Sequence, residues 1–133
     1  MGISMEGNIS TILEDMQVNR EQHTIQEHGC GSLMNLVAES NVNKKIVGNQ
    51  GEGGVTVVLE TMRAHPKCAP LQHYYCVVLM SMTYNNEHNQ KSICDNSGIE
   101  KILKAMQTHQ NNTSVQEAGC GVLDNIGWSD TAV

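Results

Sequence analysis

The stretch VTVVLETMRAH, residues 55–65, occurs twice more in the chain in diverged form. The other copies are ISTILEDMQVN, residues 9–19, and IEKILKAMQTH, residues 99–109, and all three align without gaps. Each copy has apolar residues at positions i, i+3, i+4 and i+7, the spacing of one face of an α-helix and not of a strand. The predicted apolar faces are Ile9, Ile12, Leu13 and Met16, then Val55, Val58, Leu59 and Met62, then Ile99, Ile102, Leu103 and Met106.

A second, longer helix is predicted after each copy. The three segments are IQEHGCGSLMNL from residue 25, LQHYYCVVLMSM from residue 71 and VQEAGCGVLDNI from residue 115, and the first and third agree at seven of their twelve positions. Successive copies of both helices lie 46 and then 44 residues apart, so the two helices recur as one unit. A short polar helix ending near glycine is predicted between units, around 43–50 and 88–96.

A recurring unit of short, medium and long helices with this period indicates an α-solenoid. We therefore predict one all-α domain over residues 1–133 with about eight helices. The repeat units are placed at about 8–40, 41–86 and 87–130.

Two consensus patterns connect the units to a known family. The pattern G-(I/V)-x-x-(I/V)-L-x-x-M-x-x-H, followed by V-Q-E-x-G-C-G-x-L-x-N-(I/L), resembles the armadillo repeat family, especially the divergent armadillo segments of large multidomain proteins. The resemblance extends from about Asn8 to Trp128. It implies a right-handed α-solenoid of about 2⅔ repeats that begins at the second helix of a repeat. The short extra helix favours armadillo repeats over the related HEAT repeats.

The segment QEHGCG, residues 26–31, has the residue types of a Cys–His active site or a metal site. It returns as QEAGCG, residues 116–121, without the histidine. An active-site cysteine has no reason to recur in every unit, so we expect these thiols to be packing groups, with the flanking glycines allowing close approach of neighbouring backbones. The equivalent cysteines are Cys30, Cys76 and Cys120.

Composition excludes several classes of function. The net charge of −6, with eight scattered Lys and Arg, argues against nucleic acid and anionic membranes as partners. The chain lacks an apolar run of the roughly 18 residues that a membrane span needs. Five cysteines without a C-x-x-C pair indicate reduced thiols, and hence a cytoplasmic protein.

Asn35, Ser81 and Asn125 fall at equivalent positions near the ends of the long helices. The armadillo resemblance implies that this position lies on a concave groove, where asparagine binds the backbone of an extended peptide; capping of a helix end is the alternative. The tryptophan that the family carries four residues earlier is replaced by glycine or valine, which predicts a smoother and wider groove for a helix or a domain surface. The predicted partner-binding residues are Gln26, Gly31, Asn35, Val77, Ser81, Gly121, Asp124, Asn125 and Trp128.

Two further patterns resemble ligand sites. His65, Cys68, His73 and Cys76 have a spacing that suits zinc, but the repeat accounts for much of it without a metal. The loop GNQGEGG, residues 48–54, resembles a phosphate-binding loop but has no preceding strand and no Gly-Lys-Ser/Thr ending. We expect no metal, no nucleotide and no other cofactor.

The sequence contains no recognisable set of nucleophile, base and orienting group. We therefore predict a non-catalytic interaction module or scaffold that binds a partner protein or peptide on the concave surface of the long helices. Alternatives are a structural spacer or self-associating armadillo fragment of a larger kinase-like or scaffold protein, and a Cys/His hydrolase or redox protein. The enzyme would use Cys68 or Cys76 and would need a thiol of low pKa. Neither end of the repeat array carries a polar cap, so we also expect a homo-oligomer formed through the ends, unless the chain is part of a longer protein.

Overall fold

The computed structural model describes residues 5–51 and 53–128, and in these ranges the chain forms eight α-helices and no strand. The all-α prediction is confirmed. The outermost residues of the predicted domain, including 129 and 130 of the third unit, lie outside the described residues. The helices are α1 (Met5–Val18), α2 (His23–Val37), α3 (Asn41–Asn49), α4 (Gly54–Met62), α5 (Ala69–Thr83), α6 (Glu87–Asp95), α7 (Gly98–Thr108) and α8 (Thr113–Asn125).

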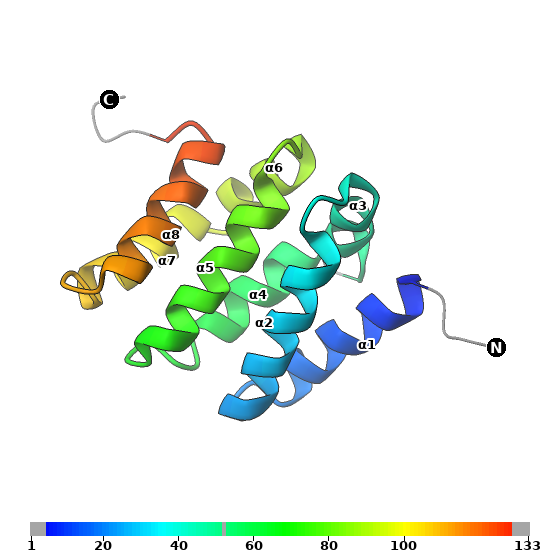
Figure 1. Cartoon of the computed structure of the whole chain (residues 1–133), viewed down its shortest axis with the longest axis horizontal. Helices are drawn as coiled ribbons and strands as arrows, with labels where there is room; N and C mark the ends of the chain where they lie inside the picture. The colour runs from blue at the N-terminus through cyan, green and yellow to red at the C-terminus, as the bar shows by residue number, and fades with distance from the viewer. Residues whose placement is uncertain (1–4, 52, 129–133) are drawn as a thin grey trace.

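The three long helices α2, α5 and α8 lie side by side, with α5 in the middle (Figure 1). The helices α1, α4 and α7 pack against α2, α5 and α8 respectively. The short helices α3 and α6 lie at the end of the molecule where α2 and α5 finish (Figure 1). No helix in the described ranges is long and apolar enough to cross a membrane.

The predicted apolar faces are buried to different extents. All four residues of the set in α4 are buried, and in α1 only Ile12 is half-buried. In α7 only Ile102 is fully buried, whereas Ile99, Leu103 and Met106 stay half-buried. The middle helix therefore has neighbours on both sides, and α7 is covered on one side only.

A glutamine in each long helix caps the preceding medium helix. The Nε2 group of Gln26 donates to the carbonyl oxygens of Met16 (2.9 Å) and Asn19 (3.0 Å). Gln72 and Gln116 make the equivalent bonds to the ends of α4 and α7. Carbonyls in the last turn of a helix have no partner inside the helix, and the glutamine amide supplies one. Gln26 is fully buried, so its predicted place on the concave surface is wrong.

Gly29 and Gly119 make room for side chains rather than for backbone. A Cβ atom on Gly29 would overlap the Met16 side chain, and one on Gly119 would overlap Met106. In the middle unit the same position is Tyr75, which is fully buried and donates its hydroxyl to Gln26 Oε1 at 3.0 Å. One repeat position therefore holds glycine twice and a hydrogen-bonded tyrosine once.

The recurring cysteines are packing groups in two of the three units. Cys30 and Cys76 are fully buried, and burial raises the pKa of each thiol to about 12. Cys120 is exposed, so the packing prediction is wrong for the third unit, where no described helix covers this side of α8. The raised pKa of the Cys76 thiol also contradicts its predicted use as a nucleophile, because the thiolate is the reactive form.

Candidate functional site

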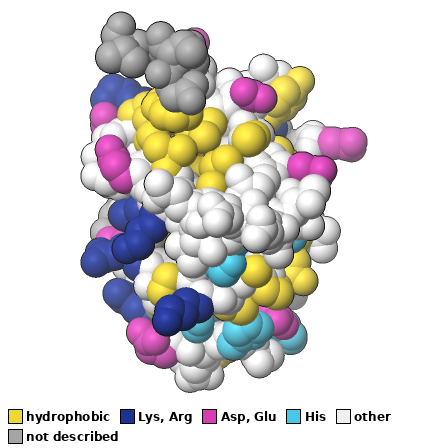
Figure 2. All heavy atoms as spheres, turned by 90° about the vertical axis from the view of Figure 1, so that its left-hand side faces the viewer, with side chains coloured by type: hydrophobic (Ala, Val, Ile, Leu, Met, Phe, Trp, Pro, Cys, Tyr) yellow, Lys and Arg dark blue, Asp and Glu magenta, His cyan; other side chains and the backbone are white. Residues whose placement is uncertain are grey.

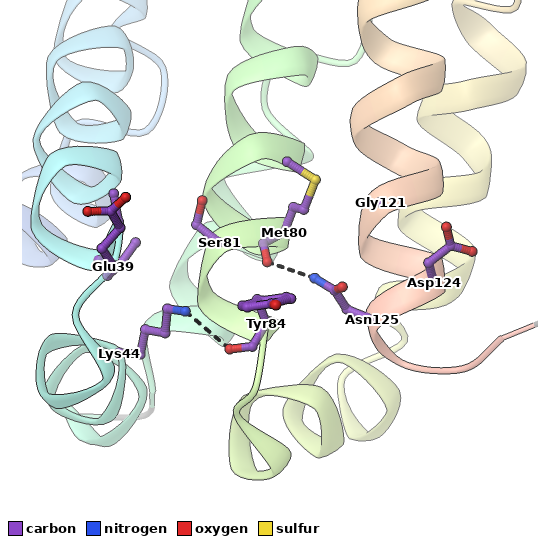
Figure 3. A pocket seen from close by; sticks show the side chains of 10 residues that line it. Glu39, Lys44, Met80, Ser81, Tyr84, Gly121, Asp124 and Asn125 are labelled. Atoms are coloured by element: carbon purple, nitrogen blue, oxygen red, sulfur yellow. Dashed lines mark hydrogen bonds between the residues drawn. The ribbon is translucent and has the colours of Figure 1, made fainter.

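A pocket of about 380 Å³ opens where the three long helices end (Figure 3). Each long helix contributes residues from its last turn or just after it, and α3 contributes one lysine. The lining residues are Val37, Ala38, Glu39, Lys44, Met80, Ser81, Tyr84, Gly121, Asp124 and Asn125.

The segment after α2 places a carboxylate at the rim of the pocket. Ser40 caps α3 by accepting a hydrogen bond from the Asn43 backbone N–H at 3.1 Å, and this fixes the turn between the two helices. Glu39 has a φ of 61° in this turn. The left-handed conformation costs a residue with a Cβ roughly 1 kcal/mol, and asparagine tolerates it better. Asn85 occupies the equivalent position after α5 with a φ of 53°.

Lys44 forms part of the pocket floor. Its side chain is only 4% exposed, and its Nζ donates to the Tyr84 carbonyl oxygen at 3.2 Å and lies 5.2 Å from the centre of the Tyr84 ring. A cation is stabilised at the carboxyl end of a helix, where the last carbonyls have no partners, and Tyr84 is the residue that ends α5. Lys44 could not be predicted from the sequence, because a lysine in a short polar helix is expected to face solvent.

Asn125 ties the third long helix to the second. Its Nδ2 donates to the Met80 carbonyl oxygen at 2.8 Å and contacts Thr83 Oγ1 at 3.2 Å (Figure 3). Both N–H groups of the amide are therefore used within the protein. Only the carbonyl oxygen of Asn125 is left for a ligand, so the predicted role as both donor and acceptor toward a peptide is not available to it.

The structure brings together four of the nine predicted residues, namely Ser81, Gly121, Asp124 and Asn125. The predicted smooth groove is wrong at Gly121, because the Met80 side chain occupies the space that a Cβ would take. The other predicted residues do not line the pocket. Asn35 is exposed and its side chain makes no hydrogen bond to a described residue, Gly31 and Val77 are half-buried, and Trp128 packs against the core beyond α8.

The pocket has an apolar floor between two carboxylates. Glu39 and Asp124 stand on opposite sides of it, with Met80, Ser81 and Tyr84 between them (Figure 3). Both carboxylates are exposed, and neither forms an ion pair within residues 5–51 and 53–128. Exposed carboxylates next to apolar side chains suit a ligand group that is both apolar and cationic.

The residues of the zinc-like pattern contact different partners and do not converge on one point. The His65 ring lies 2.7 Å from the Arg20 carbonyl oxygen through Nε2, and the His73 ring lies 3.2 Å from the Ser114 carbonyl oxygen through Nδ1. Cys68 contacts His23, with Nε2 and Sγ 3.1 Å apart, and this pair was not foreseen from the sequence. Among the described residues, no three His, Cys, Asp or Glu side chains are arranged to hold a metal ion.

The glycine-rich loop is accounted for by packing and turn formation. A Cβ on Gly48 would overlap Asn89, and one on Gly54 would overlap Val47. Gly51 and Gly53 have positive φ values of 53° and 101°, which glycine adopts at low cost. Packing and turn geometry therefore account for these glycines, and a bound phosphate is not needed to explain them.

Comparisons of the chain with protein-family models, with curated proteins and with solved structures give no match.

Proposed function

We propose that this chain is a right-handed solenoid of armadillo-like repeats that acts as a non-catalytic interaction module. It binds a segment of a partner protein in the pocket at the ends of α2, α5 and α8. The observation that carries the proposal is the apolar floor between Glu39 and Asp124, formed jointly by all three repeat units. Five free cysteines fit a reducing compartment such as the cytoplasm.

The repeat interpretation is supported by contacts that recur with the sequence period. The glutamine caps return in all three units. An asparagine also follows each of the first two long helices at the same interval, and its side chain donates to the carbonyl seven residues earlier; these residues are Asn43 and Asn89. Side chains also bridge adjacent units, as when the Asn89 amide donates to the Lys44 carbonyl oxygen at 3.2 Å. Each unit thus stabilises itself and its neighbour, which is the physical basis of a solenoid.

The chemistry of the pocket favours a partner segment in which an apolar side chain stands next to arginine or lysine. The apolar side chain would lie on Met80 and Tyr84, and the cation would face Glu39 or Asp124. The Lys44 charge offsets only one of the two carboxylates, and its ammonium group is covered and bonded to the Tyr84 carbonyl, so the exposed charges of the pocket are negative. The net charge of −6 adds a favourable long-range attraction for a basic partner.

Fluorescence anisotropy with short labelled peptides tests this proposal. In the peptides one leucine is flanked by arginines, by glutamines or by glutamates, and the protein is the full chain. We expect the arginine peptide to bind tightest and its affinity to fall as salt is raised. The variants Glu39→Asn and Asp124→Asn should each weaken it by about 1 kcal/mol, or roughly fivefold in Kd, because each removes one exposed charge interaction.

Glu100→Gln is the matched control, since Glu100 is an exposed carboxylate on α7 away from the pocket. Asparagine suits the left-handed conformation at position 39, so Glu39→Asn should fold at least as stably as the wild type. Equal binding of the three peptides, or equal losses in Glu100→Gln and Asp124→Asn, would overturn the proposed site.

Self-association through the α7–α8 end is a second candidate. Ile99, Leu103 and Met106 are half-buried, although the equivalent residues of α1 and α4 are buried, and Cys120 is exposed. Figure 2 shows this end of the molecule, where hydrophobic side chains gather in a patch. A second copy would cover the patch as one repeat covers the next. Light scattering should then give a mass that rises with concentration and falls in Leu103→Glu, whereas a constant monomer mass at high concentration would exclude this candidate.

A further inference from the structure

Side chains from two segments that lie 45 positions apart in the sequence meet at the amino ends of α2 and α5, opposite the pocket. His23 begins α2, and Cys68 immediately precedes α5. The His23 Nε2 atom lies 3.1 Å from Cys68 Sγ, and the His23 Nδ1 atom lies 3.1 Å from Glu27 Oε1. The arrangement is thiol, imidazole and carboxylate in a row.

The order of these groups fixes where the proton sits on a neutral His23 ring. An ionised carboxylate can only accept hydrogen bonds, so Nδ1 carries the hydrogen that is donated to Glu27. Nε2 then has a free lone pair directed at the Cys68 thiol. A nucleophile next to a base, with the base held by a third group, is the arrangement that activates a side chain for attack.

Cys68 also occupies a position where a different residue would stabilise the helix. It is the N-cap of α5 and makes no side-chain capping bond. At the equivalent position before α8, Asn112 accepts a hydrogen bond from the Val115 backbone N–H at 3.0 Å. Gln22, at the equivalent position before α2, also makes no side-chain capping bond, so α8 alone of the three long helices is capped in this way and Cys68 leaves its sulfur free of the helix backbone. The start of a helix also favours negative charge on the group beside it.

A second histidine, His65, lies next to His23. The His65 ring stands perpendicular to the His23 ring with centroids 6.1 Å apart. Its Nε2 is 2.7 Å from the Arg20 carbonyl oxygen, in the segment that leads into α2. The His65 ring therefore lies beside the His23 ring and is itself anchored to the segment that leads into α2.

We propose that Cys68 is a modification site for soft carbon electrophiles of the α,β-unsaturated carbonyl class, with His23 as base and Glu27 as the positioning residue. The Cys68 sulfur forms a bond to the β-carbon, and the electron pair of the carbon–carbon double bond moves to the α-carbon. The thiol proton passes to His23 Nε2 and is then given to the α-carbon. No group leaves and nothing is oxidised or reduced. This site is independent of the peptide pocket.

The test is competitive labelling of the full chain with a limiting amount of N-ethylmaleimide, followed by mass spectrometry of the peptide around each cysteine. Cys94 and Cys120 are the internal controls, because both are exposed while Cys68 is only half-exposed. Cys30 and Cys76 are buried and should remain unlabelled. We expect Cys68 to react about tenfold faster than either control, a modest value for base assistance in an exposed site.

Variants separate activation from accessibility. His23→Gln should lower the Cys68 rate to that of the controls without changing the rates at Cys94 and Cys120. Glu27→Gln should lower it by a smaller factor, because the base remains but loses its orientation. The proposal is overturned if Cys68 reacts no faster than Cys94, or if His23→Gln leaves its rate unchanged. If His23→Gln also alters the control rates, Glu27→Gln decides: an unchanged Cys68 rate there overturns the proposal.

Discussion

The junction between α2 and α5 and the junction between α5 and α8 use the same helices of the repeat but different polar ties. At the first junction the Tyr75 hydroxyl donates to Gln26 Oε1 in the interior. At the second junction the equivalent position on α8 is Gly119, which has no side chain to make such a bond. The tie there is Asn125, at the other end of the helices and in the lining of the pocket.

Because of this difference, the hydrogen bond at the first junction contributes to stability alone, whereas the hydrogen bond at the second junction also lies in the candidate binding site. Gln26 and Tyr75 are buried and reach no surface, so a change there acts on the fold alone. Asn125 holds α8 against α5 and also lines the pocket, so a ligand in the pocket acts on the same contact. The arrangement of the helices is therefore the same at both junctions. The position of the hydrogen bond between the long helices determines which junction a bound partner affects.

The largest expected effect comes from Gln26→Leu. This change leaves the Met16 carbonyl without a partner and removes the Gln26 acceptor of the buried Tyr75 hydroxyl, while the Asn19 carbonyl keeps the bond from the Gln22 backbone N–H. Because an unsatisfied buried polar group costs about 1–3 kcal/mol, we expect the free energy of unfolding to fall by ~3 kcal/mol or more. Urea denaturation followed by circular dichroism measures it.

Gln116→Leu is the matched control for that measurement. Gln116 makes the same two bonds to the end of α7 but is partly buried and has no tyrosine partner. We expect a loss of only about 1–2 kcal/mol. Equal losses of the free energy of unfolding in the two variants would mean that the hydrogen bond between Tyr75 and Gln26 does not stabilise the first junction.

Alkaline pH should act on the buried thiols. The folded protein holds Cys30 and Cys76 protonated, because burial raises the pKa of each from 9.0 to about 12, while in the unfolded chain both ionise above pH 9.0. Stability is therefore complete below pH 9 and falls as the pH rises toward 12, by about 1 kcal/mol per thiol at pH 10. Urea denaturation at pH 8 and pH 10 measures the change.

The slope of stability with pH should decrease in Cys30→Ala and stay the same in Cys120→Ala, because Cys120 is exposed in the folded protein. Burial also raises the pKa of Tyr75 beside Cys30, which adds to the alkaline sensitivity of the first junction. A slope that Cys30→Ala leaves unchanged would show that the buried thiols are not responsible.

The sequence predicted the helices well because their apolar spacing is a local property. Ile9, Leu13 and Met16 recur at helical intervals, and their burial follows from that spacing alone. Gln26 was predicted on the concave surface of the long helices, although its recurrence at three equivalent positions was a signal of an internal cap. A polar residue that repeats among buried neighbours needs an internal partner.

The pocket and the thiol cluster depend on contacts between units, which no local pattern reveals. Lys44 reaches Tyr84 across 40 positions of sequence, and His23 reaches Cys68 across 45. Four pocket residues were predicted because the repeat aligned them with the ends of the long helices. Glu39 was missed because its role comes from a left-handed turn that glutamate rarely adopts.

Asn125 is expected to stabilise the contact between α8 and α5. Asn125→Ala removes two hydrogen bonds in a half-buried position and should lower the free energy of unfolding by about 1 kcal/mol. Asn35→Ala, at the equivalent position of α2, should change it by less than about 0.5 kcal/mol, because Asn35 is exposed and makes no such bond. Thermal unfolding of both variants checks this, and equal losses would remove the distinction between the junctions.

The smallest expected effect concerns the residues that start α5 and α8. Cys68→Asn gives α5 the capping side chain that Asn112 provides for α8, and should raise the free energy of unfolding by about 0.5–1 kcal/mol. The reciprocal variant Asn112→Cys should lose a similar amount, and thermal unfolding measures both. If Cys68→Asn were instead destabilising, the contact between Cys68 and His23 would be holding α5 to α2, and the thiol would serve the first junction rather than reactivity. A gain in stability in Cys68→Asn, together with a fast maleimide reaction of Cys68 in the wild type, would mean that the chain gives up a helix cap to keep a nucleophile beside His23.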